Sequence, residues 1–370
     1  MPTTSAPPVG APTIGAATIE VVFASGTKTT CLIERGALAR LPELCAAAGL
    51  TGTAGLLCDA RLFALHREAL LALRPAFGDP LARPVSESRK TLAEVEAMCE
   101  VLSARGVQRD GFVVAVGGGV LTDLAGLAAA LFLRGVPWVS VPTTLLAQVD
   151  AGLGGKTGAN LRAGKNLVGA FHQPRLVVCD PELLATLPVR ERWSGLAEVV
   201  KCALLEGGAL LERCERDLEK AAAGDALALA PLIEGAVRLK ARIVAGDERE
   251  GAARAFLNLG HTVGHALEAA TQYARFTHGE AVALGLRGAL QISALPDRER
   301  ALALVRRLQV SADRTLDEGQ REAALQAMTR DKKARGGRVR FVLLDGIGAP
   351  RLAEVSPQDC VAALAAALAG

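Results

Sequence analysis

Between residues 18 and 180, short apolar and β-branched runs alternate with longer stretches whose apolar positions recur at helical spacing. The short runs predict strands and the longer stretches predict helices. The expected strands are Thr18–Phe23, Gly55–Cys58, Phe112–Val116 and Trp138–Val141, and the expected helices are Ala37–Ala48, Leu62–Leu73, Leu92–Arg105 and Leu121–Leu133. Such alternation is typical of parallel β/α units, so we expect an α/β domain over residues 18–180.

From Pro181 onward the pattern changes to long stretches rich in Ala, Leu, Glu and Arg with helical spacing. These predict helices at Glu191–Leu205, Gly207–Ala222, Ala226–Gly246, His261–Ala270, Gly279–Leu290, Arg298–Leu308, Glu318–Arg330 and Pro357–Leu368. One strand-like run, Arg338–Leu344, lies among them. We therefore expect residues 181–370 to form a mostly helical domain, and residues 1–17 to form a flexible tail.

Composition narrows the class of protein. Half of the 370 residues are hydrophobic (50%), which is enough to fill the cores of two domains, yet no apolar run is long enough to span a bilayer. The net charge of +3 is too small to indicate a nucleic-acid partner. The N-terminus lacks the features of a signal peptide, and the eight cysteines form no Cys-x-x-Cys pair. We expect a cytoplasmic protein with reduced thiols.

A glycine-rich turn follows the expected strand Phe112–Val116. Gly117, Gly118 and Gly119 lead into the next helix, whose first turn carries Asp123. Backbone N–H groups at a helix N-terminus can hold a pyrophosphate, and glycines let it approach closely. Thr143 and Thr144 follow the next strand, at the edge where α/β sheets bind ligands. This pattern favours a nucleotide site, although an ordinary tight turn between strand and helix would also explain the glycines.

A second Gly-rich stretch carries cationic and amide side chains. Asp150, Lys156, Lys165 and Asn166 lie between residues 150 and 166 among five glycines. We interpret this stretch as a loop that closes on a phosphate and a hydroxyl. A solvated loop with unrelated charges is the alternative. Upstream, Arg134 ends an expected helix, where the helix dipole alone would account for a cation.

Three of the five histidines lie within eighteen residues, at positions 261, 265 and 278. His261 and His265 are four residues apart on an expected helix, so their spacing nominates them as a metal-binding pair. Arg254 and Asn258 precede them at helical spacing and extend the polar face. Core or helix-capping histidines are the alternative. Glu198 and Lys201 form an i, i+3 pair in an apolar helix; Glu198 is a further ligand candidate, although such pairs are usually surface ion pairs.

Eight motifs occur in an order and spacing that resemble one family. They are GGGVLTDLAG, VPTTLLAQVDAGLGGKTGAN, GKNLVGAFHQP, SGLAEVVK, DERE, LNLGHTVGHALEA, HGEAVALG and RDKK. From about Thr18 to its C-terminus the chain resembles 3-dehydroquinate synthase. The resemblance implies a Rossmann-like parallel β/α NAD-binding domain, a mostly helical metal- and substrate-binding domain, and an active site between them. It implies Glu198, His261 and His278 as ligands of one divalent metal, zinc or cobalt, and it places His265 on the substrate side.

The resemblance assigns roles to most polar residues named above. It implies catalytic roles for Lys156, Asn166, Lys201, Arg254, Asn258 and His265. It implies substrate contacts for Arg134, Asp150, Lys165, Lys240 and one of the pair Lys332 and Lys333. It implies NAD contacts for Asp59, Glu87, Lys90, Gly117, Gly118, Gly119, Asp123, Thr143, Thr144, Thr186 and Leu187. Arg134 is expected to reach the substrate of the neighbouring subunit in a homodimer.

The family converts 3-deoxy-D-arabino-heptulosonate 7-phosphate (DAHP) to 3-dehydroquinate and phosphate in the shikimate pathway. Transient oxidation by NAD is followed by phosphate elimination, re-reduction and intramolecular aldol closure. The chain departs from the family pattern at Ser86, at Asp59-Ala60-Arg61 and at Asp150-Ala151-Gly152. The first two predict weaker adenosine contacts. The alternatives are a sugar-phosphate cyclase acting on sedoheptulose 7-phosphate, a metal-dependent alcohol dehydrogenase and a non-catalytic NAD-binding regulator.

Overall fold

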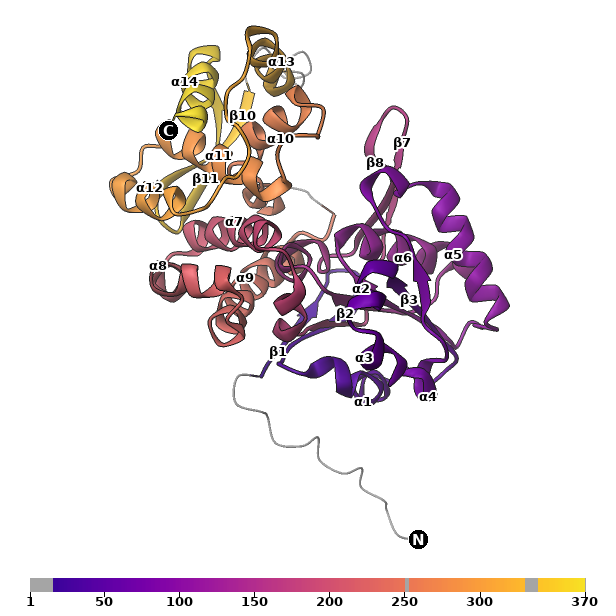
Figure 1. Ribbon diagram of the computed structural model, residues 1–370. Helices are drawn as coiled ribbons and strands as arrows, with labels where there is room; N and C mark the ends of the chain where they lie inside the picture. Colours follow the sequence, from indigo (N-terminus) through magenta and orange to yellow (C-terminus); the bar gives the residue numbers. More distant parts are fainter. Residues whose placement is uncertain (1–15, 250–252, 330–338, 370) are drawn as a thin grey trace.

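The computed structural model describes residues 16–249, 253–329 and 339–369. The N-terminal half, coloured indigo to magenta in Figure 1, contains a seven-stranded sheet. Its strands are β1 (Ala17–Val22), β2 (Lys28–Ile33), β3 (Ala54–Asp59), β4 (Leu81–Arg83), β5 (Phe112–Gly117), β6 (Trp138–Pro142) and β9 (Leu176–Cys179), in the order β1-β2-β9-β6-β5-β3-β4. The β1–β2 pair is antiparallel and every other pair is parallel, so the expected parallel β/α architecture is confirmed.

Helices cover both faces of this sheet, as they must where a parallel sheet is apolar on both sides. They are η1 (Ala37–Arg40), α1 (Leu41–Ala47), α2 (Ala60–Leu65), α3 (Arg67–Leu71), α4 (Arg74–Phe77), η2 (Glu87–Arg89), α5 (Leu92–Ala104), α6 (Gly119–Leu131) and η3 (Phe132–Arg134). On β5, Val114 and Val116 pack towards the α1–α4 face, whereas Val113 and Ala115 pack towards α5 and α6. The predicted single helix Leu62–Leu73 was wrong: the backbone leaves helical geometry at His66 and divides it into α2 and α3.

The Gly-rich stretch after β6 is not the loop that the sequence suggested. Residues Ala147–Ala151 form a π-helical turn, and β7 (Lys156–Leu161) and β8 (Gly164–Phe171) form an antiparallel hairpin. Glycine is required there for close approach of the two strands, because a Cβ atom on Gly169 would lie 2.1 Å from the Thr157 carbonyl oxygen. Figure 1 shows this hairpin projecting beyond the sheet towards the C-terminal half.

The C-terminal half is mainly helical, which confirms the expected fold class. Its elements are η5 (Pro181–Thr186), α7 (Val189–Glu206), α8 (Gly208–Ala223), α9 (Ala226–Gly246), η6 (Ala253–Asn258), α10 (His261–Ala270), α11 (His278–Gln291), α12 (Arg298–Arg306), α13 (Glu318–Thr329), β10 (Val339–Gly346), β11 (Ala349–Val355) and α14 (Pro357–Leu368). The sequence indicated β10 but missed β11, which pairs with it antiparallel. Only the pairing of the two strands buries their apolar face, so β11 alone gives a weak signal.

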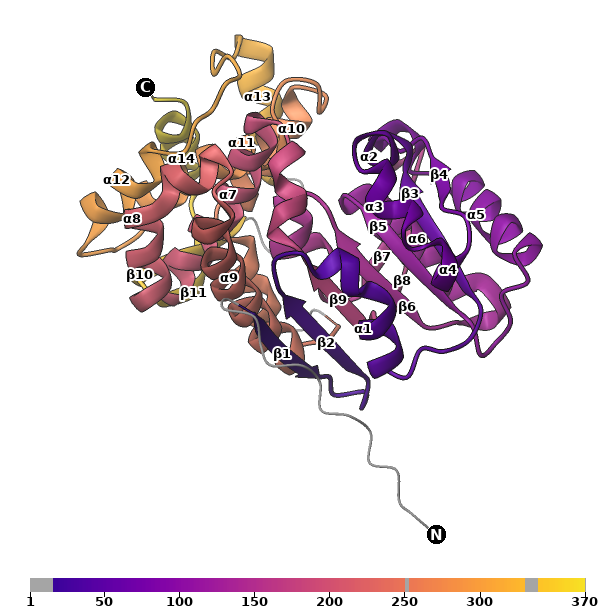
Figure 2. The same ribbon diagram turned by 60° about the horizontal axis from the view of Figure 1, so that its bottom comes forward.

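Helix α7 lies at the centre of the C-terminal half, and its residues 192–205 are all buried. The largest apolar cluster runs from α7, α8 and α9 into β1, β2 and β9, so the sheet edge and the helices share one core. Figure 2 shows α9 lying beside β1 at this edge. A central helix with no solvent-facing side must bury its polar residues too, which is how Glu198 and Lys201 enter the interior. No helix in the described part of the chain is long and apolar enough to cross a membrane.

Candidate functional site

A cavity of about 570 Å³ lies between the hairpin, Asp123 of α6, the segment around Asp150, and residues of the C-terminal half. Residues from both halves of the chain line it, including seven that the sequence singled out. These are Asp123, Asp150, Lys156, Asn166, Lys240, Arg254 and His278. Two carboxylates, three cations, an amide and an imidazole therefore share one concave space, which suits an anionic ligand with hydroxyl groups.

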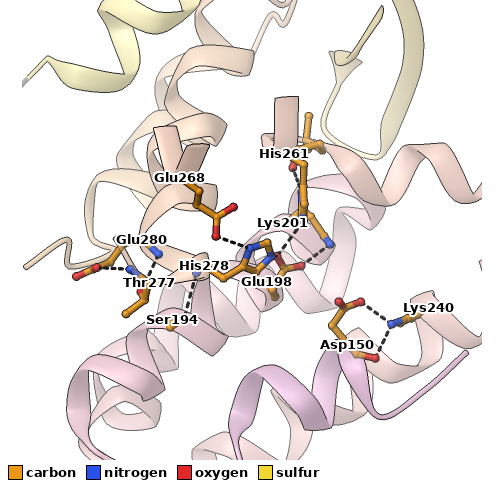
Figure 3. Close-up of polar contacts among 12 residues, drawn as sticks. Asp150, Ser194, Glu198, Lys201, Lys240, His261, Glu268, Thr277, His278 and Glu280 are labelled. Carbon is orange, nitrogen blue, oxygen red and sulfur yellow. Dashed lines mark hydrogen bonds and ion pairs between the residues drawn. The ribbon is translucent and has the colours of Figure 1, made fainter. Parts of the chain in front are cut away.

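Three side chains from three helices converge at one side of this cavity (Figure 3). Glu198 comes from α7, His261 is the first residue of α10 and His278 is the first residue of α11. Glu198 Oε1 lies 3.4 Å from His261 Nε2 and 3.5 Å from His278 Nε2. One ligand atom of each residue lies within 4.8 Å of the others, so the three could hold one metal ion.

Close backbone contacts place these histidines beside α7. His278 follows the Thr277 capping box, and the next residue, Gly279, donates its N–H to Ser194 Oγ of α7 at 3.0 Å. A Cβ atom on Gly279 would lie 1.9 Å from the Ser194 carbonyl oxygen, so only glycine permits this contact. Gly260 before His261 has φ 80° and is tightly packed against α11. The HGE and LGH motifs therefore position the two rings.

The donor set fits a metal ion. Within the described residues, neither Glu198 carboxylate oxygen accepts a hydrogen bond of normal geometry, although the side chain is only 1% exposed. Its neighbours are the two imidazoles and the ammonium group of Lys201, which is equally buried. A buried carboxylate that has an ion-pair partner but no hydrogen bond of normal geometry is stabilised further by a bound cation. Two neutral imidazole nitrogens and one carboxylate are ligands that zinc and cobalt accept.

Electrostatics within this cluster support the same assignment. Burial opposes ionisation of Glu198, but Lys201, His261 and His278 outweigh it and hold the pKa of its carboxyl well below the usual range. Burial lowers the pKa of His261 to about 3, so this ring is neutral and offers a lone pair. His278 is also buried, yet the carboxylates of Glu198 and Glu268 raise its pKa to about 10. A metal ion at Glu198 must therefore displace a proton from His278.

The structure separates His265 from the Glu198 group. The His261 and His265 rings lie edge to face with centroids 5.2 Å apart, as expected for their spacing. His265 is exposed, however, and groups with Glu268 and His278 rather than with Glu198 among the residues that the structure places. Asn258, His261 and His265 also line a neighbouring hollow of about 390 Å³ with Arg340 of β10. Arg254 and Asn258 lie on η6, which Gly260 separates from α10, so the expected continuous polar helix face was wrong.

Two buried cations, Lys240 and Arg254, line one side of the cavity. Lys240 Nζ of α9 lies 2.5 Å from both the carbonyl oxygen and the carboxylate of Asp150. Burial disfavours the charge on Asp150, but Lys240 and Lys201 prevail and lower its pKa to about 2. Burial also lowers the pKa of Lys240, yet the short contact with an ionised Asp150 keeps the pair charged. Arg254 is held by the carbonyl oxygens of Glu248 at 3.0 Å and Gly154 at 3.3 Å.

Lys90, for which a nucleotide contact was expected, lies beside the cavity-lining residues Asp123 and Asn166. Its ammonium group is 2.5 Å from Asp123 Oδ2 and 2.5 Å from Asn166 Oδ1, so it joins the first turn of α6 to the hairpin. Burial raises the pKa of Asp123 to about 6 against the attraction of Lys90. Asn166 has φ 55°, a left-handed backbone that asparagine adopts more readily than most residues. Its N–H donates to Asn160 Oδ1 at 2.9 Å.

Asn160 is a residue that sequence reasoning missed. Besides holding Asn166, its amide donates to Glu87 Oε1 at 2.8 Å, and its own N–H donates to the Lys90 carbonyl oxygen at 2.7 Å. It therefore ties the hairpin to the segment that carries Glu87 and Lys90. The one sequence feature that pointed to Asn160 was its position as the last residue of the motif VPTTLLAQVDAGLGGKTGAN.

The glycine turn and its neighbours are the remaining residues for which nucleotide contacts were expected. None of Gly117, Gly118 and Gly119 has positive φ, so these glycines serve close approach rather than unusual backbone geometry. The Thr143 N–H donates to the Gly117 carbonyl oxygen, and Thr144 Oγ1 accepts from Ala147 N. Asp59 caps α2, Thr186 Oγ1 lies 2.8 Å from a His66 ring nitrogen, and Leu187 is half-buried.

Two predicted substrate residues lie at the edge of this arrangement. Lys165 lies 4.1 Å from the ring centroid of Tyr273 and 3.5 Å from Glu87, so the hairpin tip reaches both halves of the chain. Arg134 is exposed in η3 with φ 67°, three residues after α6 ends, which removes the helix-dipole explanation for its charge. The last pair, Lys332 and Lys333, lies outside the described residues.

Comparisons with known proteins identify the family. The family models for the N-terminal and C-terminal parts of 3-dehydroquinate synthase match residues 81–194 and 195–334. The chain belongs to the 3-dehydroquinate synthase family. The 3-dehydroquinate synthase of Rhodospirillum rubrum is 45% identical over 326 residues, which are 84% of this chain and 85% of that protein. The enzyme of the same name from Citrifermentans bemidjiense is 41% identical over 86% of this chain and 91% of its own.

Solved structures show that the 3-dehydroquinate synthase family shares its fold with other cyclases. A 2-deoxy-scyllo-inosose synthase complexed with carbaglucose-6-phosphate, NAD⁺ and Co²⁺ superposes with a TM-score of 0.81 at 26% identity over 94% of this chain and 99% of its own. A 2-epi-5-epi-valiolone synthase from Streptomyces hygroscopicus with NAD⁺ and Zn²⁺ bound gives 0.79 at 30% identity over 91% and 96%. The resemblance and the fold class inferred from the sequence are both confirmed.

Proposed function

We propose that this member of the 3-dehydroquinate synthase family is a competent enzyme that converts DAHP to 3-dehydroquinate and phosphate, with NAD and one divalent metal, zinc or cobalt. One observation carries the proposal. The cavity exposes Lys156, Lys240 and Arg254 beside the candidate metal ligand His278 and the nucleotide-side residue Asp123. A substrate with both a phosphate and a carboxylate needs several fixed cations, and the cavity supplies them where the two cofactor sites meet.

In this proposal Glu198, His261 and His278 hold the metal, and the N-terminus of α6 holds the NAD pyrophosphate. When bound, the metal supplies Lewis-acid polarisation of a substrate hydroxyl, and NAD supplies a reversible hydride acceptor. Lys201 offsets the charge of Glu198 from the buried side.

The remaining cavity residues orient the substrate. Lys156 and Asn166 face it from the hairpin, while Lys240 and Arg254 face it from the helical half. The Lys240–Asp150 pair keeps a cation and a hydrogen-bond acceptor at fixed positions in that wall. Asn258 and His265, which line the adjacent hollow, complete the set at its metal side. Lys165 at the hairpin tip, and Lys332 or Lys333, supply the further cations that we assign to the substrate.

The rival substrate is a sugar phosphate without a carboxylate, such as sedoheptulose 7-phosphate. Structural neighbours named as other cyclases are 26–30% identical, whereas the 3-dehydroquinate synthases compared above are 41–45% identical. The deciding assay measures phosphate release from each substrate with sub-stoichiometric NAD. We expect many turnovers on DAHP without accumulation of NADH, and at least 100-fold slower release from sedoheptulose 7-phosphate, which lacks the carboxylate that the cavity cations would bind. Stoichiometric NADH formation would instead identify a dehydrogenase.

We further propose a homodimer in which Arg134 completes the site of the partner subunit. The exposure and left-handed backbone of Arg134 support a role outside its own fold, since such geometry costs about 1–2 kcal/mol without a compensating contact.

We also propose that the chain divides near Asp180 into an NAD-binding part and a metal- and substrate-binding part. A cytoplasmic location agrees with eight free cysteines, seven of them buried.

A further inference from the structure

The His278 ring lies between two carboxylates that come from different helices. Its Nε2 atom is 3.5 Å from Glu198 Oε1, and its Nδ1 atom is 3.4 Å from Glu268 Oε1. Figure 3 shows Glu268 on the opposite side of the ring from Glu198. Glu198 belongs to the proposed metal site, but neither the family resemblance nor the spacing of the motifs gave Glu268 a role.

Glu268 is well placed to hold the ring rigidly. It lies on α10 and is only 8% exposed. Its backbone carbonyl accepts from Tyr273 N at 2.7 Å and from Thr271 Oγ1 at 3.3 Å, so the chain folds back over the helix end. In the described part of the chain, the His278 ring is the one hydrogen-bonding partner of the Glu268 carboxylate. A buried carboxylate is costly to leave without its hydrogen-bonding partner, so this contact restrains the His278 ring.

The chemistry of imidazole links Glu268 to the metal. A neutral ring has one N–H and one lone pair, and the acceptor bonded to the N–H determines which nitrogen is the ligand. With Glu268 accepting from Nδ1–H, the lone pair is on Nε2 and points towards Glu198. We propose that Glu268 is a positioning residue that fixes the tautomer and orientation of His278 for metal binding, an inference that rests on the proposed metal site.

A competing arrangement uses the same residues differently. His265, Glu268 and His278 also bring ligand atoms within 4.8 Å of one another and could hold a cation of their own. That cation would take the Nδ1 lone pair and leave the Nε2 proton facing Glu198. The Glu198 site prevails because its carboxylate and His261 are buried, whereas His265 is exposed. A cation bound at Glu198 offsets a fully buried carboxylate, which stabilises the protein more than a cation bound beside the exposed His265.

Metal affinity of the purified, metal-free protein tests the inference. Co²⁺ dissociation constants and stoichiometry are measured by competition with a chelator for wild type, Glu268→Gln, Glu268→Met and His265→Gln. We expect one ion per chain throughout, and affinity weakened about 10- to 100-fold in Glu268→Met. Glu268→Gln, which keeps an acceptor oxygen, should weaken less, and His265→Gln should stay within about twofold of wild type. Circular dichroism of each metal-free variant checks the fold.

The outcomes separate the two proposals. No stoichiometric Co²⁺ binding by wild type would refute the proposed metal site itself. Normal wild-type binding with unchanged affinity in Glu268→Met would refute the positioning role alone. A second ion in wild type that both Glu268→Met and His265→Gln lose would show that Glu268 is a ligand. If Glu268→Met is misfolded, Glu268→Gln and a ¹⁵N resonance of the His278 Nδ1–H in the Zn²⁺ form decide: the positioning role requires that proton to be slowly exchanging in wild type.

Discussion

The substitution Lys201→Met tests whether Lys201 stabilises the buried charge of Glu198 on α7 and whether a metal ion stabilises that charge further. Lys201 and Glu198 are 2% and 1% exposed and form an ion pair at i, i+3 spacing. Removing the lysine leaves the carboxylate buried without its nearest counter-charge, which costs about 3–5 kcal/mol. Because the two halves share one core, the 370-residue chain is treated as one folding unit, and at about 2.1 cal/mol/K per residue this cost lowers Tm by about 4–6 °C. Methionine matches the length of lysine, so lost packing contributes little.

A double-mutant cycle isolates the charge effect from packing. Glu198→Met alone should also cost about 3–5 kcal/mol, because it leaves the lysine unpaired. The double variant Glu198→Met/Lys201→Met carries no buried charge at either position, and its stability should return to within about 1 kcal/mol of wild type or exceed it. As a control, Arg238→Met breaks the exposed i, i+4 pair with Glu234 and should change stability by less than about 0.5 kcal/mol.

Zinc provides the second arm of this test. Calorimetry of the metal-free proteins is repeated after adding Zn²⁺. The ion binds the native state, so it should raise the Tm of wild type, and it should raise that of Lys201→Met by more because Lys201 no longer competes with the ion for Glu198. Glu198→Met should gain least. Equal Tm values for wild type and both single variants, or a double variant no more stable than either single one, would refute the reasoning.

Three further predictions concern the metal ligands and the subunit interface. His278→Ala should lose stoichiometric metal and activity together, whereas His265→Ala should keep its metal while losing rate; the reverse pattern in a metal assay would restore the pair nominated by spacing. Metal affinity should strengthen as pH rises from 7 to 9, by up to about tenfold per unit, because the raised pKa of His278, about 10, means that binding releases its proton. Titration at both pH values in a non-coordinating buffer measures this, and a pH-independent affinity would contradict it. Arg134→Ala and Lys156→Ala should each be inactive yet regain about a quarter of wild-type activity when mixed and allowed to exchange, since about half the dimers are mixed and each of those has one intact site. No recovery after verified exchange would rule out the shared site.

The spacing of apolar residues predicted secondary structure correctly where the structure of a segment depends mainly on its own sequence. The bounds of the helix Ala226–Gly246 and of the strand that leads into Gly117 were predicted to within about one residue. Both elements depend on apolar spacing and capping residues within one continuous segment of the sequence. The Gly-rich hairpin was misread for the opposite reason. Its glycines allow Gly169 to approach Thr157 across the pair, and a contact between strands has no signature in either strand alone.

By itself the sequence determined the inventory: a glycine turn before a helix, a cationic stretch, clustered histidines, and motifs specific enough to identify the family. The tertiary structure decided which histidines lie with Glu198 and which lie apart from it. Spacing places His261 and His265 on one helix, but Glu198, His261 and His278 come from three helices that meet because Gly279 packs against Ser194. It also placed Glu268 behind His278 and buried Lys201 beside Glu198. Periodicity orders neighbours within a helix, whereas burial and ligand geometry depend on how separate helices pack.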